Sequence, residues 1–219
     1  KMSRVRDSIF VKELDTLVQQ FPNWNIVDVG GGMYPYKRAN YIVDFKEYGT
    51  VPERTFGNWP HQYWNKDTWI KSDICDTQTP LPFEDKFFDF SICMHTLEDI
   101  RNPIHVCHEL MRISKRGYIE TPSRIDESIF NNSYVGYANH RWFVEDNEDE
   151  LVFTMKSHCI YESNKMYLPS NFQFLQKNDD VMIFWWDDSF KVKEDVIIHM
   201  DEWKQKQLNF INSLNTPIK

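Results

Sequence analysis

Apolar residues in this chain recur first at helical spacing and then in short runs. The first set lies three or four positions apart and predicts an amphipathic helix over residues 4–21. The short runs that follow are β-branched or aromatic and predict strands. Pro103 suits the first turn of a second helix. The helix-spaced residues are Val5, Ile9, Phe10, Leu14, Leu17, Val18 and Phe21, and the predicted strands cover about residues 25–29, 41–44, 69–73, 88–94 and 117–120.

The pattern changes beyond Ser123. Residues 124–150 show no sustained periodicity, whereas residues 151–156 and 181–186 fit two late strands and residues 201–214 a closing helix. Strands that alternate with helices favour a parallel sheet covered on both faces. We therefore expect the α/β class, with a Rossmann-like, doubly wound, mostly parallel seven-stranded sheet. The late pair is expected to form an antiparallel hairpin at one edge of this sheet.

The first predicted strand ends in three glycines. Asn25 to Val29 reads as a short buried strand, and Gly30 to Gly32 let the backbone turn sharply with no side chain in the way of a ligand. Asp44 follows at the end of the next strand, twelve residues after Gly32. A carboxylate in that place can accept hydrogen bonds from both hydroxyls of a ribose. The pattern predicts a site for a cofactor that contains a nucleoside.

Two kinds of cofactor fit a glycine turn followed by an acid. A dinucleotide site uses G-x-G-x-x-G, which opens directly into a helix whose N-terminus holds the pyrophosphate. Here Gly30 and Gly32 are followed by Met33, Tyr34 and Pro35, so the third glycine is missing and a proline interrupts. An adenosyl cofactor without phosphate needs only the close backbone approach and the acid. Asp28, just before the turn, can hold the turn's amides or an ammonium of the cofactor.

Composition restricts the classes of protein and partner. At 219 residues with 41% hydrophobic and 16% aromatic residues, the chain can form one domain with a sizeable core. A net charge of −8 disfavours a nucleic-acid partner, which needs a clustered basic face. No apolar run approaches the roughly 18 residues of a membrane span, and no signal peptide is expected, so we expect a cytoplasmic protein without a membrane partner.

Metal binding is not predicted. The four cysteines are scattered without a C-x-x-C pair, which argues against a disulfide framework and against a structural zinc site. His105 and His108 lie close together on a predicted helix, but no further ligand pattern accompanies them.

The middle of the chain resembles the class I S-adenosylmethionine-dependent methyltransferases, in the type 11-like group. Three segments carry the resemblance together with the glycine turn and Asp44. Arg112 to Tyr118 is similar to the turn that leads into the family's fifth strand. The three segments are Ser72-Asp73-Ile74-Cys75-Asp76, Pro80-Leu81-Pro82-Phe83-Glu84-Asp85-Lys86-Phe87-Phe88-Asp89, and His95-Thr96-Leu97-Glu98-Asp99. The resemblance covers about residues 25–123.

The resemblance implies a binding site for S-adenosylmethionine. Its methionine end would lie along Asp28, Gly30 and Gly32, and Asp44 would accept the ribose hydroxyls. Asp73 would lie by the adenine amino group, with Ile74 packed on the ring. Met94 and His95 would lie under the sulfonium. Three positions depart from the family pattern: Tyr34 replaces a third glycine, Asp99 the second histidine of H-x-L-E-H, and Arg116 a proline.

Methyl transfer asks little of the protein beyond holding a nucleophile in line with the methyl group. A general base is needed when the nucleophile is a hydroxyl or a protonated amine. The candidates for that base are His95, Glu120 and His140.

We expect residues 124–150 to arch over the site as a substrate lid. The polar and aromatic side chains of this segment are candidates for substrate binding. They are Tyr137, His140, Arg141 and Trp142.

The sequence thus predicts methyl transfer from S-adenosylmethionine to a small-molecule or glycan-type acceptor, at oxygen. A nicotinamide-dependent oxidoreductase and a methyltransferase-like binding module without catalysis remain as alternatives. One domain over residues 1–219 is expected. Its parts would be a leading helix (1–24), a cofactor-binding half (25–123), the lid (124–150), and a closing hairpin and helix (151–219).

Overall fold

The computed structural model describes residues 9–50, 55–131, 133–148, 150–174 and 179–214. The chain divides into two compact units. Unit 1 comprises the described residues up to Thr96, together with residues 102–120 and 183–190. Unit 2 comprises residues 97–101 and the described residues of 121–182 and of the stretch from Lys191 onward.

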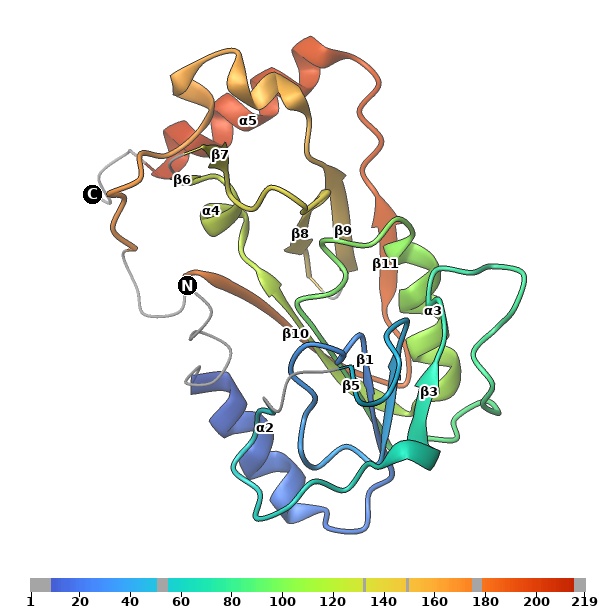
Figure 1. The fold of residues 1–219 in the computed structure, drawn as a ribbon. Coiled ribbons are helices and arrows are strands. Elements are labelled where there is room, and N and C mark those ends of the chain that lie inside the picture. Colours follow the sequence, from blue (N-terminus) through green and yellow to red (C-terminus); the bar gives the residue numbers. More distant parts are fainter. Residues whose placement is uncertain (1–8, 51–54, 132, 149, 175–178, 215–219) are drawn as a thin grey trace. The chain divides into compact units, whose positions relative to one another are not determined.

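Unit 1 is built on a six-stranded sheet in the order β10-β5-β4-β1-β2-β3. The strands from β3 to β5 all run parallel (Figure 1). This order is that of a doubly wound sheet. The chain adds strands outward from β1 on one side as β2 and β3, and on the other side as β4 and β5, so the strand order switches between β1 and β4. Ligands of such sheets bind outside the carboxyl ends of the strands at this switch point. The strands are β1 (Ile26–Val29), β2 (Tyr41–Asp44), β3 (Trp69–Lys71), β4 (Phe90–Met94), β5 (Arg116–Pro122) and β10 (Val181–Asp187).

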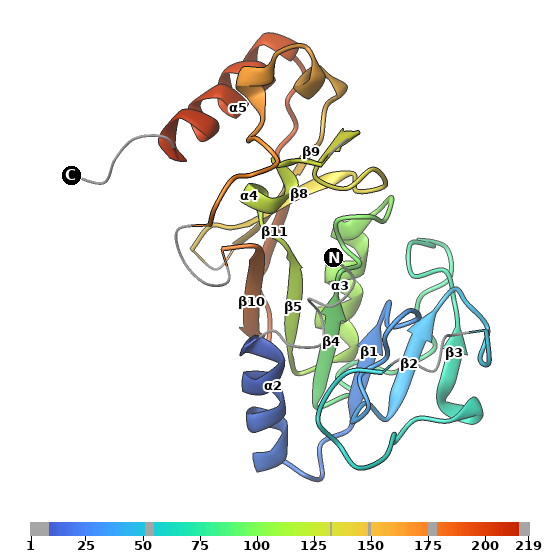
Figure 2. The ribbon, with the colours of Figure 1, turned by 60° about the vertical axis from the view of Figure 1, so that its left-hand side comes forward.

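Two helices flank this sheet on opposite sides, as Figures 1 and 2 show. Helix α2 (Ile9–Gln20) buries one apolar stripe, and alternate strand residues meet that stripe in a single core. Helix α3 (Pro103–Ile113) begins with Asn102 as its N-cap and a proline in its first turn. The core on the α2 side contains Val11, Leu14, Val18, Ile26, Ile42, Phe90, Ile92 and Tyr118.

The connection from β1 to β2 contains no helix. Parallel strands are usually joined through a helix that covers the sheet. Here residues 30–40 form turns instead, and aromatic side chains of residues 56–69 complete the core on that face. This aromatic strap consists of Phe56, Trp59, Trp64 and Trp69 packed with Tyr36.

Unit 2 contains a three-stranded sheet in the order β11-β9-β8 and a two-stranded sheet of β6 and β7. Its two small cores gather around helix α5 (Met200–Leu214), with Trp203 buried in one and Ile211 in the other. None of the helices in the described ranges is long and apolar enough to cross a membrane. The other elements of unit 2 are α4 (Arg124–Glu127), β6 (Phe130–Asn131), β7 (Tyr134–Val135), β8 (Trp142–Asp146), β9 (Glu150–Met155), β11 (Lys191–Glu194) and the 3₁₀ helices η2 (His158–Tyr161) and η3 (Asn164–Met166). Unit 1 also contains the 3₁₀ helix η1 (Lys66–Thr68).

The predicted fold class is confirmed, and the first five strands lie where the sequence placed them. Two expectations were wrong. The late hairpin does not form, because β9 pairs with β8 and β11 while β10 joins the main sheet beside β5. The described main sheet therefore has six strands, not seven. The predicted helix over residues 4–21 is observed from Ile9 to Gln20, and its first residues lie outside the described ones.

The expectation of an irregular loop over residues 124–150 was also wrong. This segment contains α4, β6, β7 and β8. Elements of two to five residues are too short to show a period in the sequence, and β8 is stabilised by its antiparallel partner β9.

Candidate functional site

The glycine turn follows β1 at the switch point of the sheet. Gly30 has a φ of +83°, which side chains rarely adopt, and its amide donates to the Val43 carbonyl at 2.8 Å. A Cβ atom at Gly30 would lie 2.3 Å from Oγ1 of Thr96. The turn therefore requires glycine for its conformation and for the close approach of the segment that leaves β4.

Asp44 lies against the same turn from the end of β2. Its Oδ2 accepts a hydrogen bond from the Gly32 amide at 2.9 Å, and its Oδ1 accepts one from the Lys46 amide at 2.8 Å. A Cβ atom at Gly32 would lie 2.3 Å from the Asp44 carboxyl carbon. A carboxylate has about four lone-pair positions, so two bound amides leave capacity for two hydroxyls.

Asp28 is the second buried carboxylate of the turn. It is 1% exposed, and its Oδ2 accepts a hydrogen bond from the Tyr36 amide at 2.8 Å. Burial raises the pKa of Asp28 from 3.8 to about 7; the Tyr36 amide opposes this shift and the negative charge of Asp44 adds to it. Such a pair of acids favours a ligand that brings positive charge.

The two residues predicted at the adenine end follow β3. Asp73 is exposed, and its Oδ1 accepts a hydrogen bond from the Cys75 amide at 3.0 Å. Ile74 is buried. The structure thus places an acid and an apolar side chain in sequence after a third strand of the same sheet.

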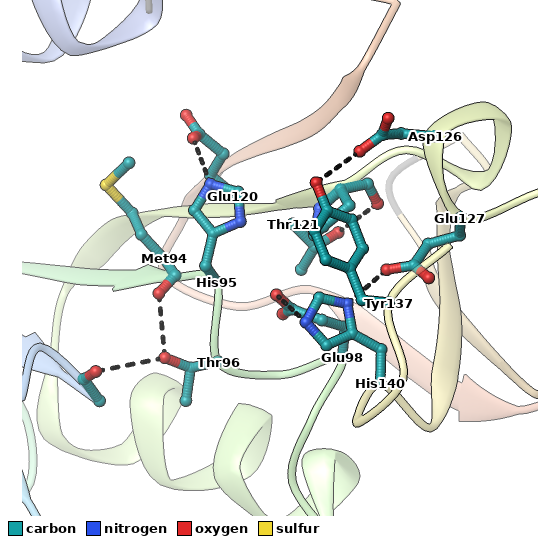
Figure 3. Close-up of polar contacts among 12 residues, drawn as sticks. Met94, His95, Thr96, Glu98, Glu120, Thr121, Asp126, Glu127, Tyr137 and His140 are labelled. Atoms are coloured by element: carbon teal, nitrogen blue, oxygen red, sulfur yellow. Dashed lines mark hydrogen bonds and ion pairs between the residues drawn. The ribbon is translucent and has the colours of Figure 1, made fainter. Parts of the chain in front are cut away.

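His95 and Glu120, predicted as separate candidates for a base, form a pair in unit 1 (Figure 3). His95 Nε2 lies 3.1 Å from Glu120 Oε1, and the His95 amide donates to the Glu120 carbonyl at 2.8 Å. The pair forms because Met94 at the end of β4 is in register with Glu120 on β5. The His95 side chain is 29% exposed, whereas that of Glu120 is 1% exposed.

Tyr118 completes this group, which we call the His95 triad: Tyr118, Glu120 and His95. The Tyr118 hydroxyl donates to Glu120 Oε2. Burial, and then the charge of Glu120, raise the pKa of Tyr118, so its phenol stays protonated and remains a donor. His95 has a φ of +47°, an uncommon conformation for a non-glycine residue that is frequent at functional sites.

His140, the third predicted base, lies in unit 2 within a second cluster (Figure 3). Its Nδ1 lies 2.5 Å from Glu127 Oε1, and its Nε2 lies 3.9 Å from Glu98 Oε1. Lys156 contributes its ammonium to Glu127 Oε2 at 2.6 Å. Both glutamate side chains are 1% exposed, so this His140 cluster is a buried charge network and not a surface loop.

The other predicted substrate residues surround His140 in different ways. The Tyr137 ring stacks on the His140 ring with centroids 4.5 Å apart, and its hydroxyl donates to Asp126 at 2.8 Å. Arg141 is exposed, and its amide donates to the Glu98 carbonyl at 2.7 Å. Trp142 is half-buried, with its Nε1 donating to the Ile100 carbonyl at 2.9 Å.

The structure therefore forms three groups from the predicted residues. Asp28, Gly30, Gly32 and Asp44 make one turn with the segment after β4. His95 pairs with Glu120 in unit 1, and Tyr137 and His140 stack in unit 2. Sequence reasoning missed Tyr118, Glu98, Glu127 and Lys156. Tyr118 could have been found, because residues two apart on a strand point to the same face as Glu120. Glu98 stands in the His95-to-Asp99 segment that carries the resemblance, whereas nothing in the sequence pointed to Glu127 or Lys156.

Comparisons with known proteins give one family match. Residues 54–119 match the family model of a methyltransferase domain. Over these residues the chain is similar to methyltransferase domains. No curated protein matches the sequence.

Among solved structures, an S-adenosylmethionine-dependent methyltransferase from Thermotoga maritima is similar at 20% identity with a TM-score of 0.39, over 64% of this chain and 65% of that one. A methyltransferase-like protein from Bacillus halodurans is similar at 15% identity with a TM-score of 0.34, over 52% of this chain and 51% of that one. An S-adenosylmethionine-dependent methyltransferase from Mesorhizobium loti is similar at 13% identity with a TM-score of 0.34, over 66% of this chain and 63% of that one. The chain thus spans between half and two thirds of the length of these proteins.

The residues around the glycine turn fit the cofactor S-adenosylmethionine. Asp44 retains acceptor capacity for two ribose hydroxyls, and Asp28 offers a buried negative charge to an ammonium. The turn does not fit a dinucleotide, because no helix begins between Gly30 and Asn40 to hold a pyrophosphate.

Proposed function

We propose that this methyltransferase transfers the methyl group of S-adenosylmethionine to an oxygen atom of a small-molecule or glycan-type acceptor. The bound cofactor supplies an electrophilic methyl group on a sulfonium. The protein's task is then to hold the acceptor in line and to take its proton. Oxygen is favoured as the acceptor atom because a hydroxyl needs a base, and the domain presents a histidine held by a buried carboxylate.

The observation that carries this proposal is the His95 triad. Glu120 Oε1 can accept the ring hydrogen of His95 at Nε2, and in that tautomer Nδ1 is the accepting nitrogen. Tyr118 holds the other oxygen of Glu120. We propose that His95 Nδ1 takes the acceptor's hydroxyl proton as the acceptor oxygen is methylated. The methyl carbon's bond to the cofactor sulfur would break in the same step, and S-adenosylhomocysteine would leave. Glu120 then stabilises the imidazolium, as the carboxylate does in other carboxylate–histidine pairs.

We propose that unit 2 recognises the acceptor through Tyr137, His140, Arg141 and Trp142. Glu98, Glu127 and Lys156 fix His140 by contacts on both ring nitrogens and by neutralising charge. A half-buried aromatic pair beside polar side chains suits a polyhydroxylated acceptor, since rings stack on its apolar face while polar groups bind its hydroxyls.

The test has a binding arm and a turnover arm. Calorimetry with S-adenosylhomocysteine and with NADH separates the adenosyl cofactor from a nicotinamide. Turnover is then measured with radiolabelled S-adenosylmethionine on a panel of hydroxylated acceptors, including sugars and glycans. His95→Ala and Glu120→Gln should each lower turnover by roughly 10²–10⁴-fold while S-adenosylhomocysteine affinity stays within about threefold.

Exposed Asp67 provides a matched control, because its side chain is remote from the triad at the 3₁₀ helix η1. Asp67→Asn should leave both S-adenosylhomocysteine affinity and turnover unchanged. Binding of NADH in preference to S-adenosylhomocysteine would contradict the proposed function. Tight S-adenosylhomocysteine binding with no turnover on any acceptor would favour the binding module.

A further inference from the structure

Asp15 on helix α2 is a buried carboxylate outside the part of the chain that resembles the family. It is 6% exposed and accepts hydrogen bonds from three donors. Its Oδ1 accepts from the Tyr36 hydroxyl at 2.8 Å and from Trp59 Nε1 at 3.0 Å, and its Oδ2 accepts from the Asn58 amide at 2.8 Å. A buried carboxylate with three good donors is fully compensated and holds its partners in fixed directions.

Tyr36 connects this carboxylate to the glycine turn. Its phenol donates to Asp15, and its own backbone amide donates to Asp28 Oδ2 at 2.8 Å. Burial, followed by the charge of Asp15, raises the pKa of Tyr36, so the phenol remains a donor. The Tyr36 ring is fully buried, and a Cβ atom at Gly57 would lie 2.6 Å from it. Both ends of Tyr36 are therefore fixed.

No helix follows the glycine turn to set the backbone of residues 33–36. In its place the strap supplies the restraint: the Phe56 amide donates to the Pro35 carbonyl at 3.1 Å, and Trp64 Nε1 donates to the Tyr36 carbonyl at 3.2 Å. Asp15 is the group that binds α2, the strap and Tyr36 together.

We propose that Asp15 is a positioning residue for the cofactor, which acts through Tyr36 to set the direction of the Asp28 carboxylate in the glycine turn. This inference rests on the proposed function, because it takes Asp28 as the acid that meets the cofactor's ammonium. Its geometry lies wholly within unit 1.

The path from Asp15 through Tyr36 to Asp28, which we call the relay, predicts a change in the pH dependence of cofactor affinity that a merely structural role would not produce. The Tyr36 amide is the contact that lowers the pKa of Asp28 against the effects of burial and of Asp44. Displacing that amide favours the protonated form of Asp28, which attracts an ammonium less. The affinity for cofactor should therefore weaken, and the pH at which it falls to half should move upward.

The experiment measures S-adenosylhomocysteine affinity by calorimetry from about pH 5.5 to about pH 8.5. Asp15→Asn removes the charge at constant shape, and Tyr36→Phe removes only the phenol oxygen. Each should weaken affinity at neutral pH by about fivefold or more, the scale of one lost buried hydrogen bond. The pH midpoint should rise in both, and the double variant should bind about as well as the weaker single variant, because both act through one path.

Asp67→Asn is the matched control for loss of one aspartate charge in unit 1 and should behave as the wild type. Wild-type affinity and an unshifted pH midpoint in folded Asp15→Asn and Tyr36→Phe would overturn the relay. If Asp15→Asn does not fold, Tyr36→Phe decides alone. Failure of the wild type to bind S-adenosylhomocysteine would instead overturn the proposed function, which keeps the two failures distinct.

Discussion

Asp28→Asn should stabilise the protein without ligand at alkaline pH while it weakens cofactor binding. In the folded state the pKa of Asp28 rises from 3.8 to about 7, chiefly because the group is buried. Between these two values the folded protein retains a proton that the unfolded chain has released. Stability from this group is therefore fully present below about pH 4 and is lost as the pH rises to about 7.

The magnitude follows from the difference between the two pKa values. At 1.36 kcal/mol per pKa unit, the full effect is about 4 kcal/mol. From pH 5 to pH 8 the wild type should lose about 2–3 kcal/mol through this group alone. The asparagine variant does not titrate, and its amide oxygen can still accept the hydrogen bond from the Tyr36 amide.

Urea unfolding of both proteins at pH 5 and pH 8 tests this expectation. Subtracting the variant from the wild type cancels the titration of every other group. The difference in midpoint should change by about 1 M between the two pH values, in favour of the variant at pH 8. A difference that is independent of pH would refute the reasoning. The same variant should bind S-adenosylhomocysteine more weakly at pH 8, because functional sites often retain groups that destabilise the fold.

Three further expectations concern the predicted site residues. Asp44→Ala should weaken S-adenosylhomocysteine binding at least about tenfold by calorimetry, since two charge-assisted hydrogen bonds to the ribose are lost, and unchanged affinity would remove Asp44 from the site. Gly30→Val and Gly32→Val should abolish thermal stabilisation by the cofactor in at least one variant, because a Cβ would lie 2.3 Å from Thr96 or Asp44; retention in both would exclude the glycine turn. His140→Ala and Arg141→Ala should keep S-adenosylhomocysteine affinity within about threefold and lower turnover by roughly 10²–10⁴-fold, and wild-type turnover in both would exclude them from acceptor recognition.

The sequence alone determined the strands around the glycine turn to a large degree. The strands around the glycine turn are short, β-branched and bounded by glycine or polar residues, so local composition specifies them. The requirement for glycine at Gly30 is also local, because the turn after β1 needs a positive φ there. Asp44 could be placed because it ends the neighbouring parallel strand, and the ends of such strands share one edge of the sheet.

Tertiary structure alone decided which strands pair and which side chains meet. The sequence predicts strands over residues 151–156 and 181–186, but it does not identify their pairing partners, and the observed partners lie in different sheets. His95 meets Glu120 only because β4 and β5 are adjacent and in register. Asp15 and Tyr36, and His140 with its two glutamates, meet across long separations in the chain. Periodicity reports how one segment divides its faces between core and solvent, whereas these contacts depend on the packing of several segments at once.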